Sequence, residues 1–246
     1  MQDFQQRDNQ SPSPHNVAVI LAAGSGARFG HAVPKQFLTV NDRMVFEYSL
    51  ETFEKHPAID EILLVCHPDY LETAQLACSR NAWRKVSHIL PGGRERYESA
   101  MAAISALQAS NPCNVILHDA ARPLLSAKIV TEVTEALQSH EAVNVAVPMT
   151  DTVLQTDPSG NHIQHVPDRR MLMASQTPQA FRFQILQEAY RRATAAGPIQ
   201  TTDEGGIILR FMPNVPVFIV PGDPRNFKVT YPDDLDRLAL LLNRHD

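Results

Sequence analysis

The chain has 246 residues, which is enough for one large domain or two small ones. Hydrophobic residues make up 43% of the sequence and charged residues 20%, a balance typical of a folded globular protein. Acidic residues outnumber lysine and arginine by 27 to 22, and the net charge of −5 argues against a general nucleic-acid or membrane-surface binder.

Residues 1–15 are polar and rich in Gln, Ser and Pro, which predicts a flexible tail without the apolar stretch of a secretory signal. The three cysteines, Cys66, Cys78 and Cys113, form no CxxC pair and indicate reduced thiols. No apolar run approaches the roughly 20 residues that span a bilayer. We therefore expect a cytoplasmic protein with one domain over residues 16–246.

Short apolar runs alternate with longer amphipathic stretches along the chain. Buried strands are predicted at residues 17–21, 61–66, 114–118, 143–147 and 215–220. Apolar stripes at helical spacing predict helices over residues 44–53, 98–107, 129–137, 185–189 and 235–242. Strands that alternate with helices predict an α/β fold with a mostly parallel sheet.

One segment interrupts this alternation. Residues 152–156 and 162–166 have the pattern of two strands, and residues 157–161 between them are turn formers. A hairpin inserted into an α/β domain has unpaired strand edges, which favour pairing with another surface. We therefore expect an arm at about residues 150–175 that packs against another subunit.

A glycine-rich segment, LAAGSGARFG (21–30), follows the first predicted strand, and PKQF (34–37) comes soon after. Its small residues let backbone N–H groups approach an anion, and Arg28 and Lys35 add positive charge. A Walker A loop is excluded because no Lys-Ser/Thr pair follows. A dinucleotide fingerprint is excluded because Gly30 comes one residue late. The alternative is a glycine-rich turn with two solvated cations.

Two further motifs follow predicted strands. GGRERYES (92–99) places Ser99 early in a helix, where it either contacts a base or ribose or simply caps the helix. HDAARP (118–123) lies where open α/β sheets bind ligands. Asp119 there suits Mg²⁺ bound to phosphates, and Arg122 suits a substrate phosphate. The alternative is a turn capped by Asp119 and paired with Arg122.

Polar motifs also occur in the second half of the chain, where each alone is typical of a solvated loop. Thr202-Asp-Glu204 has first the pattern of a helix N-cap. Together, Arg169, Lys228 and the neighbouring hydroxyls offer a second anion site.

Taken together, the motifs resemble the cytidylyltransferases of the non-mevalonate isoprenoid pathway, which act on 2-C-methyl-D-erythritol 4-phosphate. The matching segments occur in chain order: LAAGSGARFG (21–30), PKQF (34–37), GGRERYES (92–99), HDAARP (118–123), DT (151–152), QTPQAF (176–181), TDE (202–204), NFKVT (226–230) and PDDL (232–235). The resemblance implies a Rossmann-like nucleotidyltransferase with helices on both faces of the sheet and a protruding β-hairpin arm that forms a homodimer. It implies transfer of CMP from CTP, with Mg²⁺, to give 4-diphosphocytidyl-2-C-methyl-D-erythritol and pyrophosphate.

The resemblance also implies roles for individual residues. Arg28, Lys35, Arg169 and Lys228 form the implied catalytic set, with Arg169 reaching in from the partner's arm. Asp119 lies near the metal, directly or indirectly. The residues implied around CTP are Ala22, Ala23, Gly24, Gly26, Gly93, Ser99, Asp119 and Ala120. Those implied around the second substrate are Arg122, Thr152, Arg169, Thr202 and Lys228.

The chemistry agrees with this set, because a substrate phosphate is already a nucleophile at neutral pH. Positioning and cationic clamps carry such reactions, so no catalytic histidine or cysteine motif is needed.

Departures from the family pattern cluster around the second substrate. Met173 stands where a Trp is frequent, Arg225 stands where an acid is frequent, and residues 202–206 lack the usual serine. Ribitol 5-phosphate, used for cell-wall or capsule polymers, is therefore an alternative acceptor. A non-catalytic nucleotide-binding protein is a third hypothesis, which the intact Lys35 and Lys228 oppose. A nicotinamide dehydrogenase fails on the loop spacing.

Overall fold

The structure is a computed structural model and describes residues 14–24, 29, 33–107, 113–201 and 203–243. Most of the predicted tail lies outside the described residues. His15, the last residue of the predicted tail, is the first residue of strand β1. Its ring nitrogen Nε2 lies 3.1 Å from Glu61 Oε2, and the residue pairs with Cys113 in the next strand.

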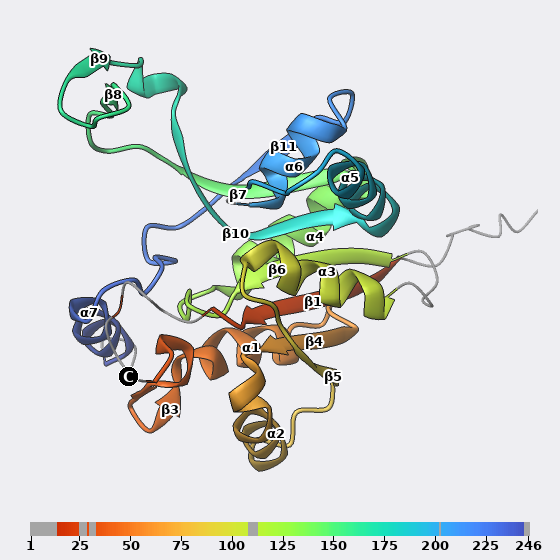
Figure 1. The fold of residues 1–246 in the computed structure, drawn as a ribbon. Helices are drawn as coiled ribbons and strands as arrows, with labels where there is room; N and C mark the ends of the chain where they lie inside the picture. The colour runs from red at the N-terminus through yellow and green to blue at the C-terminus, as the bar shows by residue number, and fades with distance from the viewer. Residues whose placement is uncertain (1–13, 25–28, 30–32, 108–112, 202, 244–246) are drawn as a thin grey trace, which may run out of the picture.

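Seven strands form one sheet within the described part of the chain, in the order β11-β7-β10-β6-β1-β4-β5. Their bounds are β1 (His15–Ala22), β4 (Glu61–Cys66), β5 (Val86–Pro91), β6 (Cys113–Asp119), β7 (Ala142–Pro148), β10 (Met173–Arg182) and β11 (Val217–Pro221). Only β10 runs antiparallel to its neighbours, β6 and β7. The prediction of a mostly parallel sheet is confirmed (Figure 1).

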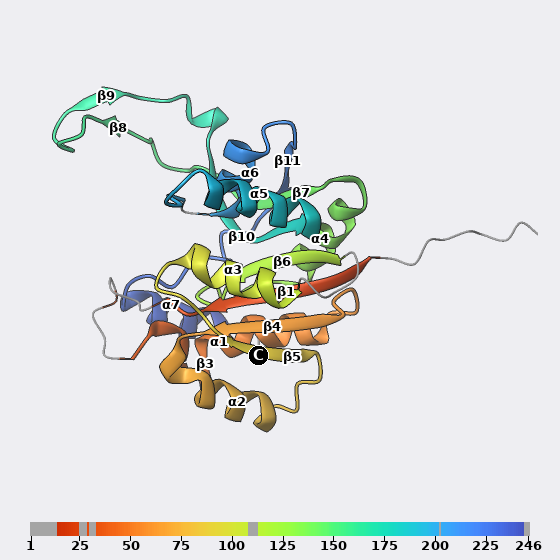
Figure 2. The same ribbon diagram turned by 45° about the vertical axis from the view of Figure 1, so that its right-hand side comes forward.

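Helices cover both faces of the sheet (Figures 1 and 2). Along β1, Ala18 and Ile20 pack toward one core and Val17 and Val19 toward the other, as the two-residue period of a strand requires. The first core contains side chains of α1 (Val45–Lys55), α2 (Leu71–Arg80) and α4 (Ala127–Ser139). The second contains those of α3 (Arg96–Leu107), α5 (Phe183–Ala195) and α6 (Glu204–Phe211).

The continuous apolar runs located the central strands to within two residues at each end. The same criterion missed β5 and β10, and it missed helix α2. In β5 the polar residues Ser87 and His88 interrupt the run because this edge strand is only half-buried. In β10 the polar run Ser175–Gln179 hides a strand whose amide side chains are buried. Burial of polar groups is invisible to a hydrophobicity pattern when their partners lie elsewhere in the chain.

The predicted hairpin is present but much shorter than expected. Strands β8 (Gln155–Thr156) and β9 (Ile163–His165) pair antiparallel, and every residue in them is exposed. The turn between them is tied by Asp157, which accepts hydrogen bonds from Ser159 and Asn161. The hairpin has no buried face within this chain, so no packing stabilises a longer ladder of hydrogen bonds between β8 and β9. The arm projects from the side of the sheet where the parallel strands end (Figures 1 and 2).

The C-terminal helix α7 (Asp233–Leu242) packs on a small hairpin made of β2 (Thr39–Val40) and β3 (Arg43–Met44). Leu238, Val40 and Val229 are buried together in a third apolar cluster. The amide of Val229 donates to Ala121 O at 2.8 Å, which fixes the segment before α7 beside the end of β6. Among the described residues, no helix combines the length and apolar character of a membrane span.

Replacement of Phe181 by alanine tests how much β10 contributes to the stability of the core. The ring is fully buried in the second core. Phe181→Ala should lower the free energy of unfolding by about 3–5 kcal/mol, because it leaves a cavity that the sheet cannot close. Chemical denaturation measures the loss. The control is Phe218→Ala on edge strand β11, whose half-exposed ring should cost less than about 1.5 kcal/mol. Equal losses would contradict this account of the core.

Candidate active site

A cavity of about 240 Å³ opens at the carboxyl ends of β1 and β6. Parallel strands that end together expose backbone groups there, which is where open α/β sheets bind ligands. Six of the residues implied by the sequence line it or its rim: Ala23, Gly24, Lys35, Gly93, Asp119 and Lys228. Residues from five separate segments therefore meet at one place. Gly26, Arg28 and Thr202 lie outside the described residues.

A single turn of 3₁₀ helix, Lys35–Phe37, positions the lysine of the PKQF motif. Phe37 stacks on Tyr70 at 4.4 Å between ring centroids, which anchors the turn. Lys35 is 8% exposed and lines the cavity. The side-chain amide of Gln36 donates to Gly24 O at 3.2 Å. This bond joins the turn to the glycine-rich segment.

The loop before α3 forms the opposite wall. The amide of Gly93 donates to Ser99 Oγ at 3.3 Å, and the amides of Arg94 and Glu95 donate to Glu98 Oε2 at 2.6 and 3.0 Å. Ser99 is buried behind the loop and does not line the cavity. In this structure its hydroxyl joins α3 to the preceding loop.

The glycine at position 92 is required by packing. A Cβ there would overlap the side chains of Ala23 and Ser99. Ala22 and Ala120 are likewise fully buried behind the cavity wall, and the amide of Ala120 donates to Leu21 O at 3.0 Å. The small residues of these motifs thus let the two loops and β6 approach one another.

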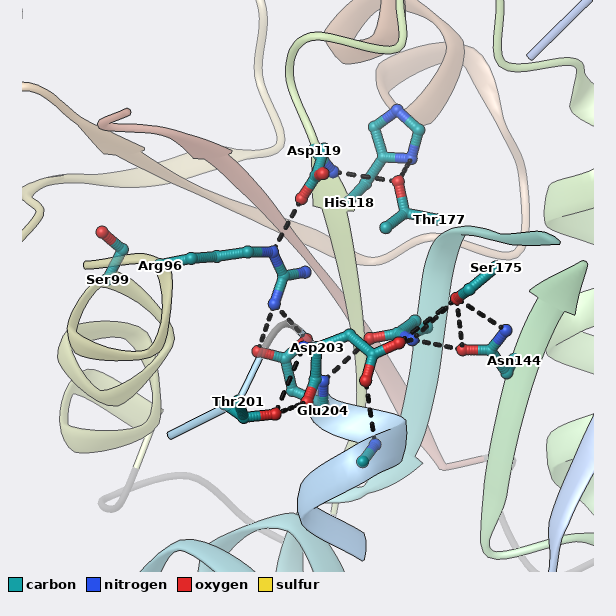
Figure 3. Close-up of polar contacts among 12 residues, drawn as sticks. Arg96, Ser99, His118, Asp119, Asn144, Ser175, Thr177, Thr201, Asp203 and Glu204 are labelled. Carbon is teal, nitrogen blue, oxygen red and sulfur yellow. Dashed lines mark hydrogen bonds and ion pairs between the residues drawn. The ribbon is translucent and has the colours of Figure 1, made fainter. Parts of the chain in front are cut away.

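Asp119, at the end of β6, lies between two cations (Figure 3 shows the first). Arg96 Nε donates to Asp119 Oδ1 at 2.9 Å, and Lys228 Nζ donates to Oδ2 at 2.6 Å. Arg96 Nη1 also donates to both carboxylate oxygens of Glu204, at 2.6 and 2.5 Å. Tyr190 OH donates to Glu204 Oε1 at 3.1 Å. These five residues form one continuous chain of alternating donors and acceptors.

Electrostatic interactions within this group of residues keep Asp119 and Arg96 charged. Burial alone would raise the pKa of Asp119, but Arg96 and Lys228 outweigh it and hold the pKa well below its ordinary range. Burial would lower the pKa of Arg96, but Glu204 and Asp119 raise it above the ordinary value. Burial and the neighbouring Glu204 raise the pKa of Tyr190, which stays a neutral donor. Asp119 is therefore a carboxylate at all physiological pH values.

His118 is fully buried directly before Asp119. The amide of Asp119 donates to Thr177 Oγ1 at 3.1 Å, so the threonine hydroxyl is left to donate to His118 Nδ1, also at 3.1 Å. His118 Nε2 then carries the proton and donates to Arg122 O at 3.0 Å. Burial lowers the pKa of His118 to about 4, in keeping with a neutral ring. His118 thus fixes the turn that holds Asp119.

The pairing of Arg122 with Asp119 suggested by the sequence is wrong for the side chains. Only the Arg122 amide reaches Asp119, donating to its carbonyl at 2.9 Å. The guanidinium donates to Asn226 O at 2.8 Å and to Ser175 O at 3.3 Å. Arg122 therefore ties β10 to the segment that carries Lys228.

The helix N-cap predicted at the TDE motif is confirmed. Asp203 Oδ1 accepts from the amide of Gly206 at 2.9 Å, and α6 begins at Glu204. Gln179 Oε1 accepts from the amide of Glu204 at 3.0 Å, and Gln179 Nε2 also donates to Asn144 Oδ1. A buried amide of β10 thereby sets the start of α6.

Sequence reasoning missed Arg96, Glu204 and Gln179 as parts of the site. Each lay inside a quoted motif, so the signal was present. Their partners, however, are up to 108 residues away in the chain. No local pattern reports such pairs.

Arg169 and Thr152 do not join the cavity of their own chain. Both are exposed in the arm, and Arg169 Nη1 donates to Thr150 O at 2.7 Å. Arg169 begins a 3₁₀ turn that is capped by Asp168, whose side chain accepts from the Arg170 amide at 3.0 Å. The second anion site expected from Arg169 and Lys228 is therefore not assembled within one chain.

The donor set limits how a divalent metal would be held. Among the described residues, no three His, Cys, Asp or Glu side chains converge on one point. Asp119 and Glu95 are the carboxylates that line the cavity within this part of the chain. This set fits Mg²⁺, which keeps few protein ligands when phosphates supply the rest.

A family model described as IspD, 2-C-methyl-D-erythritol 4-phosphate cytidylyltransferase, matches residues 16–244. The chain belongs to this family. It is accordingly a cytidylyltransferase, and the α/β nucleotidyltransferase fold expected from the sequence is confirmed.

Relatives and solved structures agree with the match. The chain is 41% identical to the 2-C-methyl-D-erythritol 4-phosphate cytidylyltransferase of Thermobifida fusca, over 93% of this chain and 94% of the relative. It is 38% identical to the bifunctional ribulose 5-phosphate reductase/CDP-ribitol pyrophosphorylase Bcs1 of Haemophilus influenzae, over 89% of this chain and 46% of that one. The 4-diphosphocytidyl-2C-methyl-D-erythritol synthase structure from Anaerococcus prevotii superposes with a TM-score of 0.82 at 27% identity, covering 94% of this chain and 97% of that one.

The buried, neutral His118 predicts a pH dependence of stability in this cytidylyltransferase. The unfolded chain takes up a proton near pH 6.5, whereas the folded protein does so only near pH 4. Stability from this group is thus complete above about pH 6.5 and is lost as the pH falls toward 4, by roughly 3 kcal/mol. Denaturation of the wild type and of His118→Gln from pH 7.5 to 4 measures it. Parallel stability curves for the two proteins would contradict the prediction.

Proposed function

We propose that the cavity transfers CMP from CTP to 2-C-methyl-D-erythritol 4-phosphate and releases pyrophosphate. The observation that carries the proposal is the meeting of Lys35, Lys228 and Asp119 at the carboxyl edge of the sheet, against a wall of small residues. Such a wall admits a triphosphate close to the backbone. Membership of the cytidylyltransferase family supports the same reaction.

The reaction needs little proton chemistry. A phosphate oxygen of the acceptor attacks the α-phosphorus of CTP, and a new P–O bond forms as the bond to pyrophosphate breaks. The main barrier is repulsion between two anions. Lys35 is placed to stabilise the charge that develops on the α-phosphoryl group, and Lys228 to hold the acceptor phosphate. We assign Arg28 to the same clamp as Lys35, by resemblance.

The remaining implied residues fall into two groups. Ala23, Gly24 and Gly93 line the cavity and would contact CTP, with Gly26 on the same loop. The three that lie behind the wall, Ala22, Ser99 and Ala120, would act by letting the loops approach. For the acceptor we keep Arg122, Thr152 and Thr202 as proposed neighbours. When bound, Mg²⁺ would neutralise the triphosphate, with Asp119 near it as a direct or an indirect ligand.

We place the protein in the cytoplasm, as one domain over residues 16–246. The three cysteines are free thiols in the structure, and burial raises the pKa of Cys66 to about 12. Unreactive thiols of this kind suit a reducing compartment.

Ribitol 5-phosphate is the second candidate acceptor, supported by the 38% identity to the Haemophilus influenzae CDP-ribitol pyrophosphorylase. Pyrophosphate release from CTP and Mg²⁺ with each acceptor in parallel distinguishes the two. We expect a clear preference for methylerythritol phosphate. A preference for ribitol 5-phosphate would move the protein to surface-polymer synthesis and leave the nucleotide site as described.

Lys35→Ala tests the clamp. The variant should lose roughly 10²–10³-fold in kcat, since a preorganised cation that meets developing charge contributes this much. Its melting temperature should change little. Lys128→Ala is the matched control, because Lys128 is a surface lysine of α4 whose Nζ lies 3.7 Å from Glu132 Oε1. Wild-type turnover by Lys35→Ala would contradict the proposed mechanism.

We also propose that the arm forms a homodimer that brings Arg169 to the partner's cavity. Five large apolar side chains are exposed on the arm and its base: Leu154, Ile163, Val166, Met171 and Met173. Met171 is 82% exposed. A two-stranded hairpin with such a surface gains stability only by burying it. A second copy of the chain offers the matching surface.

Mixing two inactive variants tests this arrangement. In a mixed dimer of Arg169→Ala and Lys35→Ala, one cavity keeps its own Lys35 and receives an intact Arg169. Random mixing should therefore restore about a quarter of wild-type activity, since half the dimers are mixed and each has one complete site. A mixture as inactive as its components would show that Arg169 serves its own chain. Light scattering of Met171→Asp checks the dimer itself.

A further inference from the structure

Arg96 lies between Asp119, at the end of β6, and Glu204, at the start of α6 (Figure 3). It is the first residue of α3, and its guanidinium reaches Asp119 with Nε and Glu204 with Nη1. Its third nitrogen, Nη2, is buried without a hydrogen-bond partner. The side chain lines the cavity. Arg96 thus contacts both carboxylates and has no other hydrogen-bond partner in the described part of the chain.

The charges in this group balance in pairs. Arg96 and Lys228 carry two positive charges, and Asp119 and Glu204 carry two negative ones. Glu204 is fully buried, so its charge depends on Arg96 for compensation. Asp119 is shared, with one oxygen on Arg96 and the other on Lys228. Lys228 is the more exposed of the two cations.

The arrival of a phosphate changes this balance. A dianion competes with Asp119 for the ammonium group of Lys228, and the lysine turns away from Asp119 at a lower cost when the carboxylate keeps another counter-ion. Arg96 is the counter-ion that this chain itself supplies, because its rigid fork stays bound to Asp119 through a separate oxygen.

We propose that Arg96 is a positioning residue that keeps Asp119 charge-balanced and so frees Lys228 for the acceptor phosphate. The inference rests on the proposed function, which assigns Lys228 to that phosphate. Glu204 holds Arg96 in place from the start of α6, so the start of α6 and the end of β6 are linked through one guanidinium.

Two variants separate this role from a purely structural one. In Arg96→Gln, the buried Glu204 is left unpaired and Lys228 is the only cation on Asp119. The melting temperature should fall, and the KM for methylerythritol phosphate should rise about tenfold or more, the weight of a hydrogen bond to a charged group. In Arg96→Gln/Glu204→Gln, the unpaired charge is gone. The melting temperature should recover, but the raised KM should remain.

The controls fix the interpretation. Glu204→Gln alone keeps Arg96 on Asp119, so its acceptor KM should rise less than that of the double variant. Arg191→Gln removes an arginine from an exposed pair with Glu188 and should change neither quantity. If the acceptor KM of the double variant returns to the wild-type value together with its melting temperature, Arg96 is structural only and the proposal falls.

Binding of inorganic phosphate, measured by calorimetry on the same proteins, makes the test independent of turnover. The double variant should bind phosphate about tenfold more weakly than the wild type. If the wild type releases no pyrophosphate with either acceptor, the proposed function fails, yet weaker phosphate binding would still support the role of Arg96. Unchanged phosphate binding would overturn it.

Discussion

The site depends on the carboxylate of Asp119, whose position is fixed by the groups around it. Asp119 ends a strand buried on both faces, and its backbone is fixed by Thr177 and, through the turn, by His118. Two cations far apart in the sequence, Arg96 and Lys228, converge on it. In a site screened from water, each pair is strong and each unpaired charge is costly. The positions of α3, α6 and the segment before α7 all follow from this one group.

The strand β10 supplies the second half of the framework. Its polar residues face the site rather than solvent: Thr177 supports Asp119, Gln179 starts α6, and the carbonyl of Ser175 receives Arg122. A strand that supplies hydrogen bonds in this way must be buried, and it therefore lies in the middle of the sheet. The elements around the cavity are thus positioned by hydrogen bonds of named side chains as well as by the apolar core.

The structural features that depend on a local sequence pattern could be predicted. Apolar runs located the parallel strands, and the glycine-rich and HDAARP motifs located the cavity, because both lie directly after strands. The partners of Arg96 and the role of Gln179 could not be predicted, since they depend on residues brought together only by the fold. The length of the arm strands was overestimated for a related reason: alternation predicts an extended chain, whereas pairing requires a surface to bury.

The central place of β10 has a consequence for how the chain is made. Strands β6 and β7 emerge from the ribosome before β10, yet they flank it and do not pair with each other. Until β10, residues 173–182, has been synthesised, one edge of β6 and one edge of β7 have no strand to pair with. Open edges of this kind pair readily with other chains. The growing chain is therefore most open to aggregation until the arm and β10 have been synthesised.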